Sequence, residues 1–203
     1  MARLSSAQRR TELVQAALRV IDRKGVHAAT TRAIVAEAGM PLASFHYAVS
    51  SRDELIRDVI AAVLDNERTA TLGSLRPGSD IRSTLRSGFQ AYFDLLVSAP
   101  GHEQALFELL HYSLRTEELA DLPGAQYAGY RATASELLHA AADHAGVHWA
   151  VPIDDVSRLL IALTDGLTLG WLADRDSEAA ARTMDLAADV IAALARSTPP
   201  ELA

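Results

Sequence analysis

The sequence predicts an all-α protein, in which an N-terminal helix-turn-helix head of three helices precedes a larger helical body, with about nine helices in all. Alanine and leucine dominate, and the 11 glycines and 7 prolines stand mainly at breaks between apolar segments. Apolar residues recur at three- and four-residue spacing, and no segment has the alternation of a half-buried strand. We expect a DNA-binding domain over residues 1–50 and a regulatory and dimerisation domain over residues 51–203.

Charge is distributed unevenly between these two parts. Residues 1–52 contain eight Arg and Lys and three acidic residues, a net charge of +5, whereas the remaining residues carry −12 and the whole chain −7. A basic head on an acidic body is typical of a nucleic-acid-binding module attached to a domain that does not bind nucleic acid.

The sequence disfavours several classes of protein. It has no cysteine, so neither a disulfide framework nor a cysteine metal site is expected. The first ten residues lack the apolar run of a signal peptide. The most apolar window, Leu159–Ala173, contains Asp165 and is too short to span a bilayer. We therefore expect a cytoplasmic protein with no cofactor and no metal.

The first two predicted helices begin the head. Ser6–Lys24 has apolar residues at helical spacing on one face, and Gly25 ends it. A second helix covers Arg32–Ala38. Its cap is the hydroxyl of Thr30 or Thr31, which can accept an otherwise unpaired backbone N–H.

A tight turn then leads to a short third helix. Gly39 can take the left-handed conformation of a helix C-terminus, and Pro41 suits the start of the next helix, over Leu42–Tyr47. Ser50 or Ser51 caps the helix that follows. A helix, a glycine turn and a short helix form the helix-turn-helix signature, in which the second helix enters the major groove of DNA.

The body is expected to contain six further helices, the first of which joins it to the head without a break. Their expected ranges are 51–72, 80–97, 102–115, 126–144, 154–173 and 177–196. Loops are expected at 73–79, 100–101, 122–124 and 146–152, and the tail from residue 197 is expected to fray. The expected caps of the fifth, eighth and ninth helices are Asp80, Asp154 or Asp155, and Ser177.

The head also carries a gap-free pattern of residue types. The pattern consists of Thr31, Ile34, Ala36, Ala38-Gly39, Ser44-Phe45, Tyr47, Ser51-Arg52 and Glu54-Leu55. With it, the N-terminal 60 residues resemble the DNA-binding head of the TetR family of bacterial transcriptional regulators. The resemblance implies a two-fold dimer that binds a palindromic operator and releases it when a small ligand enters the body.

Roles in DNA binding follow residue by residue from this pattern. Thr31 and the amides at its helix start are expected to meet a phosphate, and Tyr47 and Arg52 to contact phosphates beside the groove. The recognition helix has no Lys or Arg, so base reading rests on polar side chains, apolar contact and DNA shape. A basic arm can add general attraction through Arg3, Arg9 and Arg10. The predicted DNA-binding residues are Thr31, Arg32, Pro41, Leu42, Ala43, Ser44, His46, Tyr47 and Arg52.

The helix at 154–173 is apolar on more than one face, so it must be buried on two sides, against its own body and a partner. With the helix at 177–196 it is expected to form a four-helix interface about a two-fold axis, with ordinary intrachain core as the alternative. The predicted interface residues are Leu163, Gly166, Leu167, Gly170, Met184, Ala187, Ala188 and Ile191.

Inward aromatic residues of the body can line an apolar cavity with a few polar groups, although the same residues can be plain core. An acid such as Asp165 inside an apolar helix is costly unless it is paired with an Arg, a backbone amide or a ligand. The predicted ligand-binding residues are Phe89, Tyr92, Phe107, His111, Tyr127, Tyr130, Asp165 and Trp171.

Two Glu-x-x-His motifs favour a different class of protein. Glu108–His111 and Glu136–His139 each place a carboxylate and an imidazole on one helix face, as in di-iron four-helix proteins. Those sites also need a Glu from each of two further helices, where this chain offers only Asp94 and Asp165.

The sequence therefore favours a ligand-responsive regulator, a repressor rather than an activator, that binds operator DNA as a homodimer and is not an enzyme. The alternatives are a di-metal helical-bundle enzyme and a helical dimer that binds a small molecule without DNA.

Overall fold

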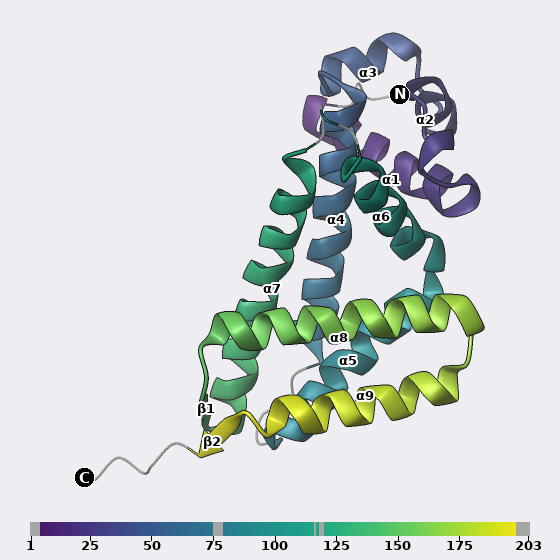
Figure 1. Cartoon of the computed structure of the whole chain (residues 1–203). Coiled ribbons are helices and arrows are strands. Elements are labelled where there is room, and N and C mark those ends of the chain that lie inside the picture. The colour runs from purple at the N-terminus through teal and green to yellow at the C-terminus, as the bar shows by residue number, and fades with distance from the viewer. Residues whose placement is uncertain (1–4, 75–78, 116, 118–119, 198–203) are drawn as a thin grey trace. The chain divides into compact units, whose positions relative to one another are not determined.

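The structure, a computed structural model, describes residues 5–74, 79–115, 117 and 120–197 (Figure 1). Within these residues the chain is nearly all helical, with nine α-helices, one 3-10 turn and two short strands. In chain order the elements are α1 (Ser6–Lys24), η1 (Val26–Ala28), α2 (Thr31–Glu37), α3 (Leu42–Ala48), α4 (Arg52–Gly73), α5 (Ile81–Ser98), α6 (Pro100–Ser113), α7 (Leu122–Ala145), β1 (Val147–Trp149), α8 (Ile153–Asp174), α9 (Ser177–Ala192) and β2 (Ala195–Ser197). The expectations for Arg3, for residues 75–78 of the predicted loop and for residues 198–203 lie outside the described residues.

The chain divides into two compact units. Unit 1 comprises residues 1–65 and 99–123, and unit 2 comprises residues 66–98 and 124–203. α4 continues without interruption across the division after Asp65, so one helix belongs to both units. The functional boundary at residue 50 stays a prediction.

α1 begins at a capping box. The Ser5 hydroxyl accepts a hydrogen bond from the backbone N–H of Gln8 (3.1 Å), and the Gln8 side chain accepts one from the N–H of Ser5 (2.8 Å). Gly25, with φ 78°, ends the helix and donates its N–H to the carbonyl of Ile21 (2.8 Å). The apolar face is buried, as the side chain of Leu13 shows with 0 % exposure. The first predicted helix is confirmed.

The helix-turn-helix is built by local caps. Thr30, rather than Thr31, is the N-cap of α2, and its hydroxyl accepts the N–H three residues later. Gly39 has φ 64°, the left-handed conformation expected after α2. Pro41 stands immediately before α3, and Phe45 of α3 is 1 % exposed in the core of unit 1. These contacts hold a short helix that could not persist alone.

α6 belongs to unit 1 and lies against α1. The Glu108 carboxylate accepts the backbone N–H of Val26 (3.1 Å). A Cβ added at Gly101 would lie 2.6 Å from the Cα of Asp22, so only glycine permits this approach. The predicted turn at 100–101 is wrong, because these residues form the first turn of α6, where Pro100 lacks only an N–H that a helix leaves unpaired.

Unit 2 is held together mainly by α5, α8 and α9. Its core gathers buried residues of these helices, among them Phe89, Phe93, Val156, Met184 and Ile191. Ion pairs join the outer edges of α5 and α9, from Arg82 to Asp189 (2.6 Å) and from Arg86 to Asp185 (2.9 Å). Asp80 caps α5 as predicted, by accepting the N–H of Ser83 (2.9 Å).

Two short strands were not expected from the sequence. β1 and β2 pair antiparallel, with Val147 opposite Ser197 and Trp149 opposite Ala195. α9 therefore ends at Ala192 instead of near residue 196. Three-residue strands are too short to produce a recognisable alternation, and their pairing joins segments far apart in the sequence.

Three helix starts also differ from the expectation. α7 begins at Leu122 with Pro123 in its first turn, so the predicted loop at 122–124 is helix. α8 follows Pro152, and the predicted caps at 154 and 155 lie inside its first turn. α9 is capped by Asp176, whose carboxylate accepts two backbone N–H groups, so the predicted cap Ser177 is one residue too late.

Candidate DNA-binding face and ligand site

α2 and α3 present exposed side chains above a buried underside. Phe45 is 1 % exposed and Val49 2 %. Most of the predicted DNA-binding residues are exposed, namely Arg32, Pro41, Leu42, Ala43, His46 and Tyr47. The others, Thr31, Ser44 and Arg52, are half-buried. The structure thus separates a core side from a face that can meet a partner.

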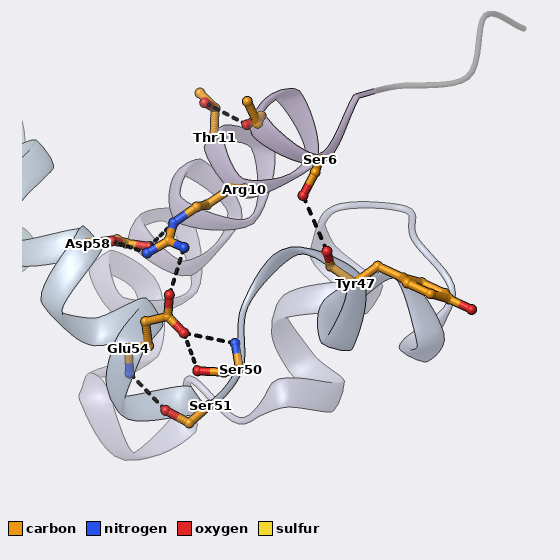
Figure 2. A network of polar contacts seen from close by, with 9 residues as sticks. Ser6, Arg10, Thr11, Tyr47, Ser50, Ser51, Glu54 and Asp58 are labelled. Atoms are coloured by element: carbon orange, nitrogen blue, oxygen red, sulfur yellow. Dashed lines mark hydrogen bonds and ion pairs between the residues drawn. The ribbon is translucent and has the colours of Figure 1, made fainter.

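Tyr47 is the most prominent side chain of this face, with 75 % of its surface exposed. Its ring extends away from α1 in Figure 2, while its backbone carbonyl accepts a hydrogen bond from the Ser6 hydroxyl (3.2 Å). The backbone at the end of α3 is therefore tied to α1, and the phenol reaches solvent.

The Arg10 guanidinium joins α1 to α4 (Figure 2). It donates to both oxygens of Asp58 (2.7 and 2.8 Å) and pairs with Glu54 (2.6 Å). Glu54 also accepts the N–H (2.8 Å) and the hydroxyl of Ser50. The Ser50 hydrogen bonds, followed by that of Arg10, lower the pKa of Glu54 to about 2. Because Ser50 follows α3, this network ties the segment after α3 to α1 and α4, and the Arg10 guanidinium is already paired with two carboxylates.

Arg52 has a structural role within unit 1 in addition to any contact with DNA. Its Nε donates to the carbonyl of Ala29 (2.9 Å) and its Nη2 to the carbonyl of Val26 (2.9 Å). These carbonyls lie in the link between α1 and α2. The planar guanidinium therefore ties the first turn of α4 to the entry of α2.

Other arginines of the head differ in whether they have a partner. Arg19 (2.9 Å) and Arg23 both pair with Glu37, and their hydrogen bonds lower the pKa of that carboxyl. Arg32 is exposed, and its guanidinium makes no ion pair or hydrogen bond among the described residues. The net charge of the head therefore overstates the charge available to DNA, whereas Arg32 remains available.

A polar cluster in unit 2 joins the start of α7 to α8. The Tyr127 hydroxyl donates to Asp165 Oδ2 (2.7 Å), and the Gln126 amide donates to the Tyr130 hydroxyl (2.8 Å). The two tyrosine rings meet edge to face, with centroids 5.3 Å apart. Two of the predicted ligand-binding tyrosines and Asp165 are thus brought together.

Hydrogen bonding in this cluster is incomplete. Gln126 is 5 % exposed, and its Oε1 is buried without a hydrogen-bond partner among the described residues. Burial raises the pKa of Asp165, whose hydrogen bond from Tyr127 acts in the opposite direction. Burial, with the hydrogen bond to Asp165, raises the pKa of Tyr127 to about 12.

The other predicted ligand-binding residues divide between the units. The Tyr92 hydroxyl meets that of Thr168 (2.6 Å) in unit 2. Phe89 (4 % exposed) and Trp171 (7 %) are buried in the core of that unit. Phe107, half-buried, and His111, exposed, lie on α6 and belong to unit 1.

Many of the predicted dimer residues are covered by their own unit. Leu167, Met184, Ala187, Ala188 and Ile191 are at most 5 % exposed within a single chain, where they belong to the core of unit 2, and their part in a dimer interface stays a prediction. Leu163 is half-buried, and Gly166 and Gly170 are exposed. The exposed large apolar residues on these two helices are instead Leu169, Leu186 and Val190.

The carboxylates of the two Glu-x-x-His motifs both have protein partners. Glu108 accepts the N–H of Val26, and Glu136 forms a two-bond pair with Arg68 (2.6 and 2.7 Å). In the part of the chain that the structure describes, no group of three or more His, Asp or Glu is placed to hold a metal ion.

Sequence reasoning missed Gln126, and it singled out Glu108 only for the metal motif. The one local signal for Gln126 is its position four residues before Tyr130, which places both on one helix face. Glu108 contacts a residue 82 positions earlier, and no local pattern indicates that contact.

Two family matches cover most of the chain. Residues 13–59 match the family described as bacterial regulatory proteins, tetR family, and residues 81–196 match the C-terminal domain of BetI-type transcriptional repressors. The chain is 31 % identical over 172 residues to the HTH-type nicotine-responsive transcriptional repressor HdnoR of Paenarthrobacter nicotinovorans, covering 85 % of this chain and 88 % of that protein.

Solved structures show the same fold. A transcriptional regulator from Rhodococcus sp. Rha1 has a TM-score of 0.71 at 19 % identity, covering 94 % of this chain and 99 % of that one. A putative TetR-family regulator from Rhodococcus sp. has a TM-score of 0.77 at 18 % identity, covering 91 % and 98 %.

The matched families consist of DNA-binding transcriptional regulators rather than enzymes, so the di-metal enzyme is set aside. The gap-free pattern in the head, the nearly all-helical fold and both family matches agree. The chain belongs to the TetR family of bacterial transcriptional regulators, with a C-terminal domain of the BetI type.

Proposed function

We propose that this protein is a cytoplasmic, homodimeric repressor that binds a palindromic operator and leaves it when a small organic effector binds unit 2. The observation that carries the proposal is the construction of α2 and α3. Their outer side chains are exposed, while Phe45 and the Arg10 network hold them from beneath. A rigid scaffold with an exposed recognition helix is what major-groove binding requires.

α3 enters the major groove with Ala43, His46 and Tyr47 towards the DNA. Tyr47, with 75 % exposure, can reach a phosphate or a base edge without disturbing the core. Arg32 supplies a positive charge beside the groove, and its guanidinium has no competing partner in the described chain. Contacts from the half-buried Thr31 and Ser44 are part of the same proposal and need the closer approach of DNA.

The dimer forms through α8 and α9. α8 is long and apolar enough to cross a membrane, contrary to the expectation that its apolar window is too short, and only 28 % of that window is buried within the chain. In a family of DNA-binding regulators, a second copy is the natural cover for such a helix. Leu169, Leu186 and Val190 supply exposed apolar surface, and Gly166 and Gly170 allow close helix approach.

α4 transmits the signal because it is continuous from unit 1 into unit 2. Its first turn holds the α1–α2 link through Arg52, so a change in α4 moves the recognition helix as well. An effector that favours head spacings away from about 34 Å, the distance between successive major grooves, lowers operator affinity by shifting the population of conformers. The nicotine-responsive repressor that the chain resembles supports an organic effector.

Operator binding tests the proposal directly. Duplexes selected by the purified protein from genomic and random DNA are expected to contain a palindrome. Fluorescence anisotropy at 0.15 M salt then compares variants on that site. Ala43→Glu places a negative charge on the recognition face and is expected to weaken binding by roughly 100-fold, and Tyr47→Ala by roughly tenfold.

The matched control is His148→Ala, which removes an exposed ring from unit 2. It is expected to bind the operator as the unchanged protein does. Binding without any sequence preference, or equal binding by Ala43→Glu and the control, would overturn the proposal.

A further inference from the structure

The polar cluster of unit 2 contains hydrogen-bond acceptors that are not matched by donors. Gln126 Oε1 is buried without a partner, and the only described polar partner of Asp165 is the Tyr127 hydroxyl. Two of the neighbouring donors point elsewhere or are shared within the cluster, because one N–H of the Gln126 amide donates to Tyr130 and the Tyr127 hydroxyl donates to Asp165. A molecule that binds here must therefore bring donors of its own.

The negative charge of Asp165 also favours a ligand that brings hydrogen-bond donors. Asp165 is half-buried on an apolar helix, and no Arg, Lys or His of the described chain pairs with it. A carboxylate held away from water without a cation is unfavourable, and a cationic ligand relieves that cost. Tyrosine rings next to the carboxylate also attract cations through their π faces.

We propose that the effector is a protonated organic amine, whose ammonium group binds Asp165 beside the rings of Tyr127 and Tyr130, with Gln126 Oε1 accepting a second hydrogen bond. This inference rests on the proposed function, in which unit 2 holds the effector, and it adds the chemical class. Anions are disfavoured, because both open groups are acceptors. Neutral ligands without donors leave Gln126 Oε1 unpaired.

Binding of benzyl compounds to the full-length protein at pH 7 tests the class. N,N-dimethylbenzylamine is protonated at this pH, whereas benzyl methyl ether is neutral and benzoate is an anion of similar size. Titration calorimetry is expected to show at least tenfold tighter binding of the amine than of either other compound. Asp165→Asn, of the same shape, is expected to remove at least tenfold of the amine affinity.

The control Asp143→Asn removes an exposed acid from the same helix as Tyr127 and is expected to leave amine binding unchanged. Circular dichroism verifies that Asp165→Asn is folded. Benzylamine, with three N–H groups, tests the second acceptor. Gln126→Met is expected to weaken the binding of benzylamine at least threefold and to leave the binding of dimethylbenzylamine unchanged.

The inference is overturned if benzoate or the ether binds as well as the amine, if the amine does not bind at millimolar concentration, or if Asp165→Asn binds it normally. Its failure is separable from that of the proposed function, because operator binding is measured without amine. Binding of the palindrome without any binding of amine would contradict only the proposed class of effector. Amine binding through Asp165 in a protein that ignores DNA refutes only the proposed function.

Discussion

The helix-turn-helix in unit 1 and the Tyr127–Asp165 cluster in unit 2 use polar groups in opposite ways. In the head, Arg10 meets two carboxylates and Arg52 meets two carbonyls, so the charges that shape the scaffold are satisfied internally. In unit 2, within the residues that the structure describes, Gln126 Oε1 has no donor and Asp165 has no cationic partner. The polar groups of the head thus find their partners within the chain, whereas those of the cluster do not all find one among the described residues.

This difference separates two requirements of a regulator. A DNA-reading helix has to keep one geometry, which internal hydrogen bonds and close packing provide. A ligand site has to gain free energy from its ligand, so it retains groups that the folded chain alone does not satisfy. We therefore expect substitutions in unit 1 to reduce stability, and substitutions in the cluster to affect stability little or favourably.

The largest effect is expected at Gly101. In Gly101→Ala the new Cβ would lie 2.6 Å from the backbone of Asp22, so α1 and α6 must separate. We expect a loss of about 3 kcal/mol in the free energy of unfolding, measured by urea denaturation. Gly124→Ala, where nothing lies within 4 Å, is the control and is expected to be neutral or slightly stabilising. Equal stability of both variants would show that unit 1 is not tightly packed.

Arg52 offers the next largest effect and separates two roles. Arg52→Lys keeps the positive charge but loses the forked donation to Val26 and Ala29, and we expect a loss of about 2 kcal/mol in unfolding free energy. If Arg52 also contacts a phosphate, the lysine variant binds the operator better than Arg52→Gln does. Equal stability of the unchanged protein and Arg52→Lys would contradict the structural role.

The head was more predictable from the sequence than the cluster, for a physical reason. The Thr30 cap, Gly39 and Pro41 act on backbone within a few residues, so their effect is visible in a short window. Glu108, in contrast, caps an N–H 82 positions away, and the orphaned oxygen of Gln126 depends on how α7 packs. Asp165 could be predicted because an acidic residue within an apolar helix is unusual, and the sequence alone shows it.

A smaller effect, opposite in sign, is expected at Asp165. Burial raises the pKa of Asp165 above its ordinary value of 3.8, so the carboxyl costs no stability below that value. The cost grows as pH rises from there towards the folded pKa and is complete above it. The free energy of unfolding of Asp165→Asn is therefore expected to equal that of the unchanged protein at pH 3 and to exceed it at pH 7 by on the order of 1 kcal/mol. Thermal unfolding at both pH values measures this. A loss of stability at pH 7 would mean that the carboxylate is structural, as in the head.

The smallest effect is expected at Glu54. Here the ionised carboxylate has hydrogen-bond partners, so it stabilises the fold, and its removal is expected to lower the melting temperature. Its pKa is lowered from 4.5 to about 2, first by the Ser50 hydrogen bonds and then by Arg10. The stability that ionised Glu54 contributes is thus present above pH 4.5 and is lost as pH falls towards 2. Glu54→Gln is expected to melt below the unchanged protein at pH 7 and together with it near pH 2.

The control for Glu54 is Glu12→Gln, an exposed acid of α1, whose melting curve is expected to follow that of the unchanged protein throughout. Because Ser50 lies directly after α3 and bonds to Glu54, we expect the same variant to loosen α3 as well. Operator affinity of Glu54→Gln is therefore expected to fall at pH 7, although the Glu54 carboxylate is bonded to Arg10 and Ser50. A normal affinity together with a lowered melting temperature would show that the Arg10 network stabilises unit 1 without orienting α3.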